Sequence, residues 1–356
     1  MAQAVSIDAE RCVHSRIETA SCRACEDVCP RRAWRLDDDG LVLSEADCDG
    51  CGLCVPACPT RAISNPTNSP ARQWIGGQDV LMVACDQAVA EGEDGHLPCL
   101  HALGLSELLQ HWRKGERIWL TASGDCDQCE RGRGPRLSDR LEKLNALFQA
   151  RGRHQVLLKQ VPVEQWRRLR QLGNVDSRQA RDNRRGFLSR LVNRPIPVLG
   201  GSTLPEGIDR ADLAPGEYLS GNGPLPWTIH LNPSACVACH ACVRVCPTHA
   251  LQHEGGTQSS TVSKAHCYSL EHTKCVGCGL CTDVCEPGAI TLRPWVRPDQ
   301  AFILLHESTC RHCGVRFHVP AVRMEELGRC WVCADGHRKP RLYQVLDAPE
   351  GTGPRA

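Results

Sequence analysis

The chain has 356 residues, 25 of which are cysteine, and its formal net charge is +1 at pH 7. It is too long for a typical secreted scaffold held by disulfides, and its near-neutral charge gives no reason to expect a nucleic-acid partner. No apolar run reaches the roughly 18 residues that a membrane-spanning helix requires, so no membrane span is expected.

Residues 1–70 contain two cysteine phrases of one type. Four cysteines with the spacing C-x2-C-x2-C-x3-C precede Pro59, and four more precede Pro30 with the first gap stretched to nine residues. This is the bacterial [4Fe–4S] signature, in which three close thiolates hold one cube and the fourth reaches a second cube. The expected ligand sets are Cys12, Cys22, Cys25 and Cys58 for one cube, and Cys48, Cys51, Cys54 and Cys29 for the other.

The residues around these cysteines predict short strands. Residues 6–11 and 60–65 have the pattern of opening and closing strands, and residues 34–43 can form a hairpin across Asp39 and Gly40. Zinc sites and disulfides are the alternatives to iron, but zinc sites pair their C-x2-C units across longer gaps. Residues 5–68 resemble a two-cluster bacterial ferredoxin.

Residues 71–175 predict a different kind of domain. Strands are expected at 79–85, 117–126 and 154–161, and amphipathic helices at 105–115 and 137–153. This alternation predicts a small α/β layer. Four cysteines lie at the expected strand ends, and four thiolates are enough to hold one [2Fe–2S] cluster. They are Cys85, Cys99, Cys126 and Cys129.

The same segment resembles the delta-subunit domain of methyl-viologen-reducing hydrogenase. The resemblance lies in VACD, LPCLHALG and WLTASGDCDQC, followed by an amphipathic helix and a strand. It implies a [2Fe–2S] cluster that passes electrons between a hydrogenase or formate dehydrogenase and a heterodisulfide-reductase-like flavoprotein. The family's second cysteine after the first strand has no counterpart beyond Cys85, and its last cysteine pair is shortened to C-D-Q-C. A zinc site and a redox-active dithiol at Cys126 and Cys129 remain alternatives.

Residues 176–228 form the expected linker. Residues 178–195 contain six arginines and one acidic residue, which indicates either a basic amphipathic helix that docks on an acidic partner or a solvated linker helix. From 195 to 227 the density of Pro and Gly predicts a flexible connector.

Residues 229–296 repeat the ferredoxin pattern, with opening and closing strands at 227–235 and 288–294. Gly277 and Gly279, like Gly52 in the first half, are expected to let backbone N–H groups approach the sulfurs, where hydrogen bonds raise the reduction potential. Cys267 lies in an inserted loop and belongs to no phrase; we expect a small buried hydrophobic residue. The ligand sets are Cys236, Cys239, Cys242 and Cys285, then Cys275, Cys278, Cys281 and Cys246.

Residues 297–346 predict a zinc ribbon, and residues 347–356 a disordered tail. Two C-x2-C units, separated by 16 residues, supply Cys310, Cys313, Cys330 and Cys333. Four thiolates close a tetrahedral zinc site that is redox-silent. His312 and His318 lie nearby and are expected on the surface, because the cysteines already complete the site.

The expected fold class is α+β, with two dicluster ferredoxin modules, a small α/β domain and a zinc ribbon. No GxGxxG, P-loop or radical-SAM pattern and no catalytic group is found, so the chain is not expected to be an enzyme on its own. We expect a cytoplasmic electron-transfer subunit of a larger complex, because the N-terminus has no signal-peptide pattern. Its expected partners are a dehydrogenase, hydrogenase or flavoprotein. The alternative is an assembly factor or redox sensor for an iron–sulfur enzyme.

Metal content tests these assignments directly. Anaerobically purified protein should contain about sixteen irons from four cubes, or about eighteen with a [2Fe–2S] centre, together with matching sulfide and about one zinc. Elemental analysis and EPR spectroscopy would measure this. A colourless preparation that holds only zinc would contradict the iron–sulfur assignment.

Overall fold

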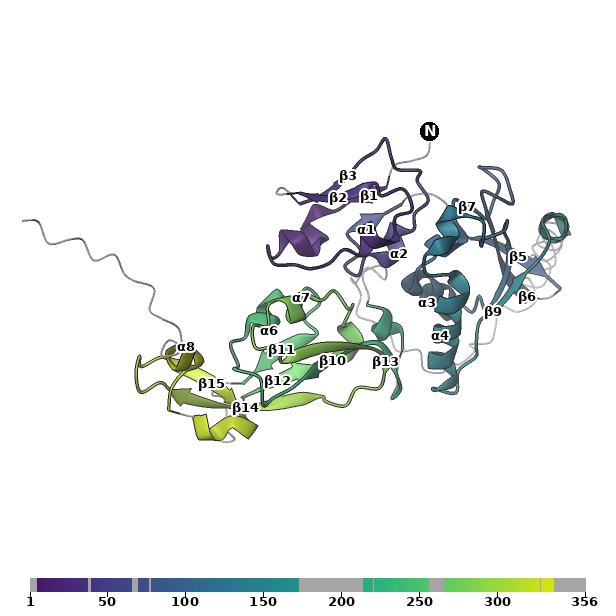
Figure 1. Cartoon of the computed structure of the whole chain (residues 1–356). Helices are drawn as coiled ribbons and strands as arrows, with labels where there is room; N and C mark the ends of the chain where they lie inside the picture. Colours follow the sequence, from purple (N-terminus) through teal and green to yellow (C-terminus); the bar gives the residue numbers. More distant parts are fainter. Residues whose placement is uncertain are drawn as a thin grey trace, which may run out of the picture.

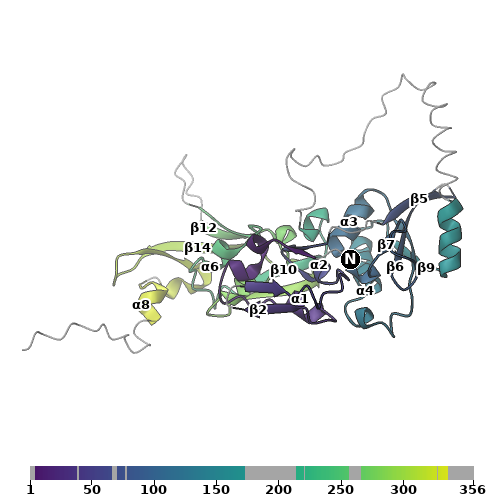
Figure 2. The same cartoon turned by 90° about the horizontal axis from the view of Figure 1, so that it is seen from above.

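The computed structural model describes residues 5–37, 40–65, 70–76, 78–172, 214–219, 221–255, 266–326 and 328–335. Figure 1 shows the two cysteine-rich modules packed one against the other. The first contains α1 (Ala24–Val28) and α2 (Cys54–Ala57), and the second contains α6 (Ala241–Val245) and α7 (Leu280–Asp283). The sheet of residues 71–160 and the C-terminal residues lie at opposite ends of the molecule in both perpendicular views (Figures 1 and 2). Within the described residues, no helix combines the length and apolarity needed to cross a bilayer.

The first module is built from very short elements. The predicted hairpin is present, with Trp34 paired to Leu43 and Asp37 to Gly40. The opening and closing strands pair antiparallel, Ile7 with Ile63. The elements are β1 (Ser6–Ile7), 3-10 turns Ala9–Arg11 and Val13–Ser15, α1 (Ala24–Val28), β2 (Trp34–Asp37), β3 (Gly40–Leu43), α2 (Cys54–Ala57) and β4 (Ile63–Ser64).

The central residues form a five-stranded sheet in the order β5-β6-β8-β9, with β7 also paired to β6. Strands β6, β7, β8 and β9 are parallel, and β5 is an antiparallel edge strand that the sequence pattern did not predict. The elements are β5 (Ala71–Ile75), β6 (Gln78–Cys85), β7 (His96–Leu97), a 3-10 turn Leu100–Ala102, α3 (Leu105–Arg113), β8 (Ile118–Ala122), a 3-10 turn Glu130–Arg133, α4 (Leu137–Gln149), β9 (Leu157–Gln160) and a helix at 163–172.

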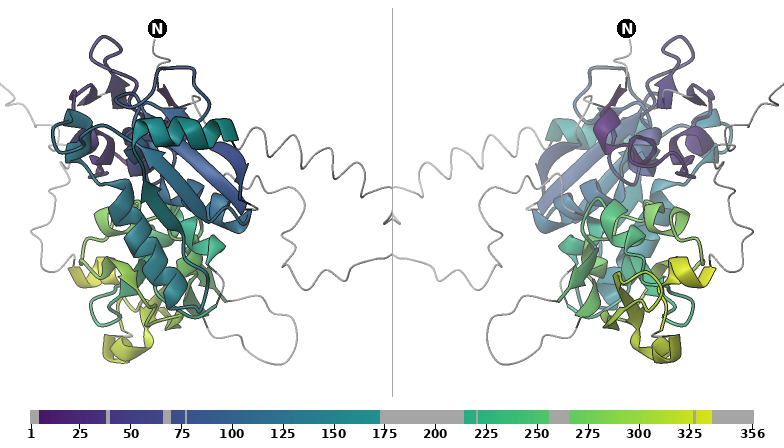
Figure 3. Two further views of the ribbon diagram at one scale, coloured as in Figure 1. Left: turned by 90° about the vertical axis from the view of Figure 1, so that its right-hand side faces the viewer. Right: turned by 90° about the vertical axis from the view of Figure 1, so that its left-hand side faces the viewer.

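Strand β6 is buried on both faces, which explains its continuous apolar sequence. Its side chains alternate, as the two-residue period of a strand requires. Leu81 and Val83 pack with residues of α3 and α4, including Leu108 and Phe148. Val80, Met82 and Ala84 pack on the opposite face with Trp166 of helix 163–172, which lies across the sheet in Figure 3. The helices therefore cover both faces of the sheet.

The second module shares its sheet with the C-terminal residues. Strands β11, β12, β14 and β15 are antiparallel neighbours in that order, so strands on either side of residue 297 belong to one sheet. A separate pair, β10 and β13, joins the opening and closing segments. The elements are β10 (Leu225–Leu231), α6 (Ala241–Val245), β11 (Leu251–Glu254), β12 (His266–Leu270), a 3-10 turn His272–Lys274, α7 (Leu280–Asp283), β13 (Ile290–Val296), β14 (Phe302–Thr309), β15 (Arg316–Pro320), a 3-10 segment Ala321–Glu326 and α8 (Trp331–Asp335).

The basic segment 178–195 lies outside the described residues. The end of the expected flexible connector is instead packed into the fold, which corrects that prediction for residues 214–219 and 221–227. Residues Pro215–Tyr218 form a 3-10 turn. Tyr218, Leu219 and Leu225 belong to the same buried cluster as the residues of α3 and α4. This cluster joins the central sheet to the second module.

Two glycines between β6 and β7 offer a matched test of packing. Gly92 (φ +90°) and Gly95 (φ +82°) both adopt backbone that favours glycine. An alanine Cβ at position 95 would lie 2.5 Å from the carbonyl oxygen of Met82, whereas one at 92 would meet no atom within 4 Å. Each Gly→Ala change should cost about 1–2 kcal/mol from backbone strain, and Gly95→Ala about 1–3 kcal/mol more from overpacking. Thermal unfolding of both anaerobic variants would measure this, and equal midpoints would contradict it.

Candidate iron–sulfur and metal sites

The backbone after the fourth cysteine has the same form in all four phrases. The residue three positions later has a positive φ of 53–61° in each case: Arg32, Arg61, His249 and Gly288. The residue four positions later donates its N–H to the cysteine sulfur at 3.1–3.4 Å; these donors are Ala33, Ala62, Ala250 and Ala289. Such hydrogen bonds stabilise a thiolate and tune a cluster held by it. The stretched phrase at Cys12 therefore ends in the same local structure as the three unstretched ones.

The loop between the first three cysteines also repeats. Gly52 (φ +73°) and Gly279 (φ +83°) each follow the second cysteine of a phrase, where the chain turns through the left-handed region. After each of these turns, the N–H of the next residue bonds the cysteine before the glycine, Leu53 to Cys51 and Leu280 to Cys278, and lowers the pKa of that thiol against the larger effect of burial. In the third phrase the equivalent residue is His240, at φ +63°.

The sixteen cysteines of the phrases gather in four groups, each of which combines three residues of one phrase with the last residue of its partner. Three groups line small cavities. These are Cys12, Cys22, Cys25 and Cys58, then Cys29, Cys48, Cys51 and Cys54, then Cys246, Cys275, Cys278 and Cys281. In the fourth group, the charges of Cys236, Cys239 and Cys285 all act on Cys242.

The surroundings of these thiols suit a metal–sulfur cluster. Burial, with the charges of neighbouring cysteines, raises the pKa of Cys25, Cys54 and Cys242 to about 12. Thiols in such places ionise only when positive charge compensates them. Iron ions at the point where four sulfurs converge supply that charge, so the donor set fits a [4Fe–4S] cube.

The four central cysteines meet at one edge of the sheet. Cys85 ends β6, Cys99 follows β7, and Cys126 and Cys129 follow β8. Because these strands are parallel, their carboxyl ends lie at the same edge, and the four cysteines line one cavity there. None of the four takes part in a disulfide in this structure. Burial raises the pKa of Cys99 to about 11.

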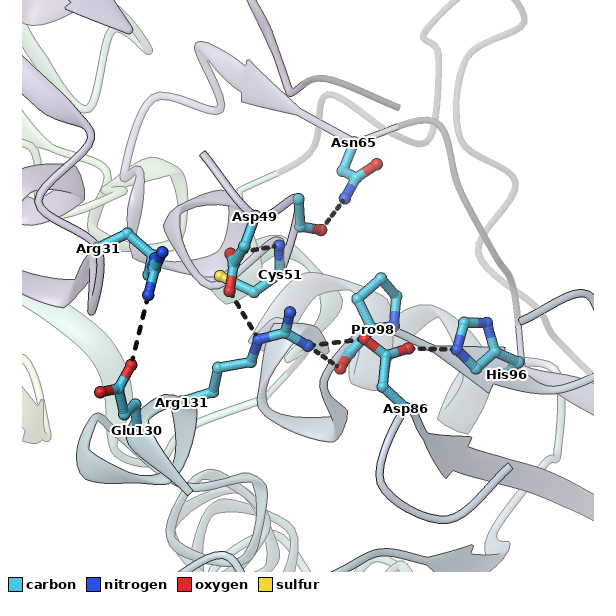
Figure 4. Close-up of polar contacts among 10 residues, drawn as sticks. Arg31, Asp49, Cys51, Asn65, Asp86, His96, Pro98, Glu130 and Arg131 are labelled. Atoms are coloured by element: carbon cyan, nitrogen blue, oxygen red, sulfur yellow. Dashed lines mark hydrogen bonds and ion pairs between the residues drawn. The ribbon is translucent and has the colours of Figure 1, made fainter. Parts of the chain in front are cut away.

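Arg131 connects this edge to the first module (Figure 4). Its Nε donates to Asp49 Oδ2 at 2.9 Å, and its Nη1 donates to Asp86 Oδ2 and to the Pro98 carbonyl, both at 2.8 Å. Asp49 in turn accepts the N–H of Cys51 at 3.2 Å. Beside this network, Cys51 and Cys99 belong to one small buried cluster. One guanidinium therefore links the surroundings of two cysteine groups, and no local sequence pattern predicted it.

A second contact joins the two modules. Asp283 accepts hydrogen bonds from the backbone N–H and the hydroxyl of Ser21, at 2.9 and 2.8 Å. The neighbouring Cys22 and Cys278 are close enough for the charge of Cys22 to raise the pKa of Cys278, after the larger effect of burial.

The C-terminal cysteines also converge. The sulfurs of Cys310, Cys313, Cys330 and Cys333 all lie within 4.8 Å of one another, which suits one tetrahedral ion. Backbone hydrogen bonds from Cys330 and Cys313 lower the pKa of Cys310 to about 6. Cys267, expected to be a buried hydrophobic residue, is only half-buried on β12.

The placement of His318 differs from the prediction. His312 is exposed as expected, but His318 is half-buried on β15 and groups with His240 and His253. Burial, then the charges of His253 and His318, lower the pKa of His240 to about 4. The prediction failed because these residues come from distant segments whose strand register brings them together.

Four segments of the chain match models of the 4Fe-4S binding domain. Residues 41–64, 229–252 and 268–291 match one model, and residues 9–32 match a second model of the same description. Together these segments contain all sixteen cysteines of the four phrases. They are therefore ferredoxin-type domains.

Two curated proteins are similar to parts of the chain. Pyruvate synthase subunit PorD of Thermotoga maritima is 38% identical over 64 residues, which are 18% of this chain and 56% of that subunit. NADH-quinone oxidoreductase subunit I 2 of Geobacter metallireducens is 30% identical over 57 residues, 16% of this chain and 44% of that subunit. The chain thus spans about half the length of the curated relatives it matches.

Arg131→Ala tests the contact between the first module and the central sheet. Removing a cation near Cys51 should make the potential of the adjacent centre more negative, because a positive charge stabilises an added electron. Losing the partly buried ion pairs of Arg131 with Asp49 and Asp86 should lower the free energy of unfolding by about 1–3 kcal/mol. An EPR redox titration and thermal unfolding would measure both effects.

Arg72→Ala is the matched control, because Arg72 also pairs with two carboxylates, Asp79 and Glu116. Asp79 lies near the start of β6, at the opposite end of that strand from Cys85. It should leave every cluster potential unchanged. Equal potentials in the wild type and the Arg131→Ala variant would show that Arg131 does not act on a cluster.

Proposed function

We propose that the chain is an iron–sulfur electron-transfer subunit in which the cysteine sites act as one series of redox centres. Each of the four groups in the ferredoxin-type segments would hold one [4Fe–4S] cube. The observation that carries the proposal is that each of these groups, and the central group, adjoins the next in a series.

The order of the series follows from four links between neighbouring groups. At one end, the charges of both Cys242 and Cys246 act on Cys281, which places the two groups of the second module side by side. The charge of Cys22 in the first module acts on Cys278, and Ser21 beside it bonds Asp283 of the second module. Within the first module, α2 carries Cys54 of one group and precedes Cys58 of the other. Cys51 finally lies beside Cys99 of the central group. An electron would thus pass between neighbours at each step.

The central group would hold a [2Fe–2S] cluster, as in the delta-subunit domain that residues 71–175 resemble. Its position at the end of the series supports a redox centre over zinc, because a redox-silent ion there could not pass electrons between the series and a partner at this end. The four C-terminal cysteines would hold zinc and stabilise residues 297–346 as a ribbon joined to the second module.

Partners follow from the same reasoning. The relatives are named as subunits of pyruvate synthase and of NADH-quinone oxidoreductase. We propose that this chain likewise belongs to a redox complex, and that it relays electrons between a dehydrogenase or hydrogenase and an acceptor that docks at the central domain. The division into modules at 1–70, 71–175, 229–296 and 297–346, linked by 176–228, belongs to this proposal.

The alternative function is a redox sensor or assembly factor for an iron–sulfur enzyme. The two classes differ in cluster durability, because a carrier must reduce and reoxidise without breakdown whereas a sensor loses its cluster when oxidised.

Repeated redox cycling tests the proposal. The anaerobic protein would be reduced with dithionite and reoxidised with an oxygen-free dye over several cycles, with iron content and EPR spectra recorded after each. We expect constant iron and reversible spectra. Loss of most iron in the first cycle would support the sensor or assembly function instead.

Two variants make this experiment specific. The double variant Cys126→Ser and Cys129→Ser should lose only the spectral component of the central site, while the four cubes continue to cycle. Cys267→Ser, outside all groups, should change neither. An unchanged spectrum in the double variant would show that the central cysteines hold no redox centre.

A further inference from the structure

Four histidines and a tyrosine gather beside one of the cysteine groups. His253 lies on β11, His266 and Tyr268 on β12, and His318 on β15. The register places them on one face of the sheet: His253 is opposite Tyr268, and His318 is opposite Glu307, two residues from the partner of His266. In this sheet β14 lies between β12 and β15, and Figure 1 shows the four strands together.

The fourth histidine comes from the loop that carries the cysteines. His240 directly follows Cys239, and its ring packs against His253 and His318 at centroid distances of 4.6 and 5.0 Å. Its Nε2 lies 3.0 Å from Nδ1 of His318. Two imidazole nitrogens bound to one tetrahedral zinc ion lie about 3.3 Å apart, given Zn–N bonds of about 2.0–2.1 Å. The observed separation differs from this by only a few tenths of an ångström.

We propose that His240, His253 and His318 form a second, all-nitrogen metal site for a divalent transition-metal ion of the zinc class. One ring nitrogen from each residue lies within 4.8 Å of the other two. Imidazole is a preferred ligand of zinc and its neighbours in the first transition series. Three protein ligands leave a fourth position for water or a small anion.

Hydrogen bonds from neighbouring side chains orient two of the proposed ligands, His240 and His253. The hydroxyl of Tyr268 lies 3.0 Å from Nδ1 of His240, so Nε2 is the nitrogen left to bind an ion. Nδ1 of His266 lies 3.3 Å from Nε2 of His253, and Nε2 of His266 lies 3.9 Å from Glu307. Such second contacts fix ring orientation and raise ligand affinity.

The hydrogen bonds of the cluster leave one buried ring nitrogen unsatisfied. This is Nε2 of His318, which has no hydrogen-bond partner among the described residues and lies on the other side of the ring from the Nδ1 that faces His240. Leaving such a group unsatisfied costs about 1–3 kcal/mol. His240 also occupies a left-handed position that is glycine at the equivalent places, Gly52 and Gly279.

A cleft adjoins one of the three histidines. His318 lines this cleft of about 750 Å³, together with Glu286 of the second module and Arg323 of the C-terminal part. A cube bound by four thiolates carries net negative charge, and His240 adjoins one of its proposed ligands. A cation at the histidines would therefore be attracted to the cube and would raise its potential.

Zinc titration of the full chain tests the site. Anaerobic wild-type protein, His240→Gly and His318→Gln would each be titrated with Zn²⁺ alone, with calorimetry and bound-zinc analysis. The wild type should bind one more zinc per chain than either variant, or bind it at least tenfold more tightly. Glycine suits the backbone at position 240, so His240→Gly should keep its fold and its cubes.

His306→Gln is the matched control. His306 is exposed on β14, and its side chain points away from the face of the sheet that carries the histidine cluster, because the flanking Leu305 and Glu307 pair with His266 and His318 on that face. It should bind zinc as the wild type does. Equal zinc uptake and affinity in the wild type, His240→Gly and His318→Gln would overturn the proposed site.

A second readout locates the ion. In an EPR redox titration, zinc should shift the potential of one cube to a more positive value in the wild type and the His306→Gln control, and not in His240→Gly. This arm rests on the proposed cubes, whereas zinc binding does not, so the two proposals fail separately. Zinc uptake that depends on the histidines but shifts no potential would retain the site and refute its position beside a cube.

Discussion

Both ferredoxin-type modules depend on one constraint: in each of the four cysteine groups, four sulfurs must converge on one buried position. Their helices α1, α2, α6 and α7 have only four or five residues, and β1 and β4 only two. Elements this short are not stable by themselves in water. In the first module, Cys25 and Cys54 are themselves among the few buried core residues. Bonds from sulfur to iron would thus take the place of a large apolar core, and cluster binding would be coupled to folding.

The central domain solves the same problem in a different way. Its parallel strands are covered by helices on both faces and contain large buried side chains such as Trp119 and Trp166. Of the four central cysteines only Cys85 belongs to this core, and all four lie at one edge of the sheet. A cluster at such an edge can contact a partner while the sheet holds its ligands in place. The same apolar core extends to Tyr218 and Leu225, which fixes the second module to it.

Sequence spacing predicted the local features well and the long-range ones poorly. The grouping of Cys12 with Cys58, the hairpin at Trp34 and the cysteines at the ends of β6 and β8 all follow from short patterns of spacing or periodicity. By contrast, three features depend on how distant segments pair. These are the pairing of β12 with β14, the ion pair of Arg131 with Asp49 and the position of His318. A single sequence carries no periodic signal for such contacts, because each partner alone resembles an ordinary surface residue.

Charge is distributed unevenly along the proposed series of centres. Arg131 places a cation beside Cys51, where the first module meets the central domain, and its side chain is only 20% exposed, so solvent screens it weakly. At the other end, burial lowers the pKa of His240 and His318, so both side chains are uncharged at neutral pH. A positive charge would be present there only when an ion is bound. An added electron is stabilised near whichever cation is present. Because Asp49 and Asp86 offset the charge of Arg131, this residue alone sets no direction of electron transfer. An ion at the histidines would stabilise an electron at the far end of the proposed series.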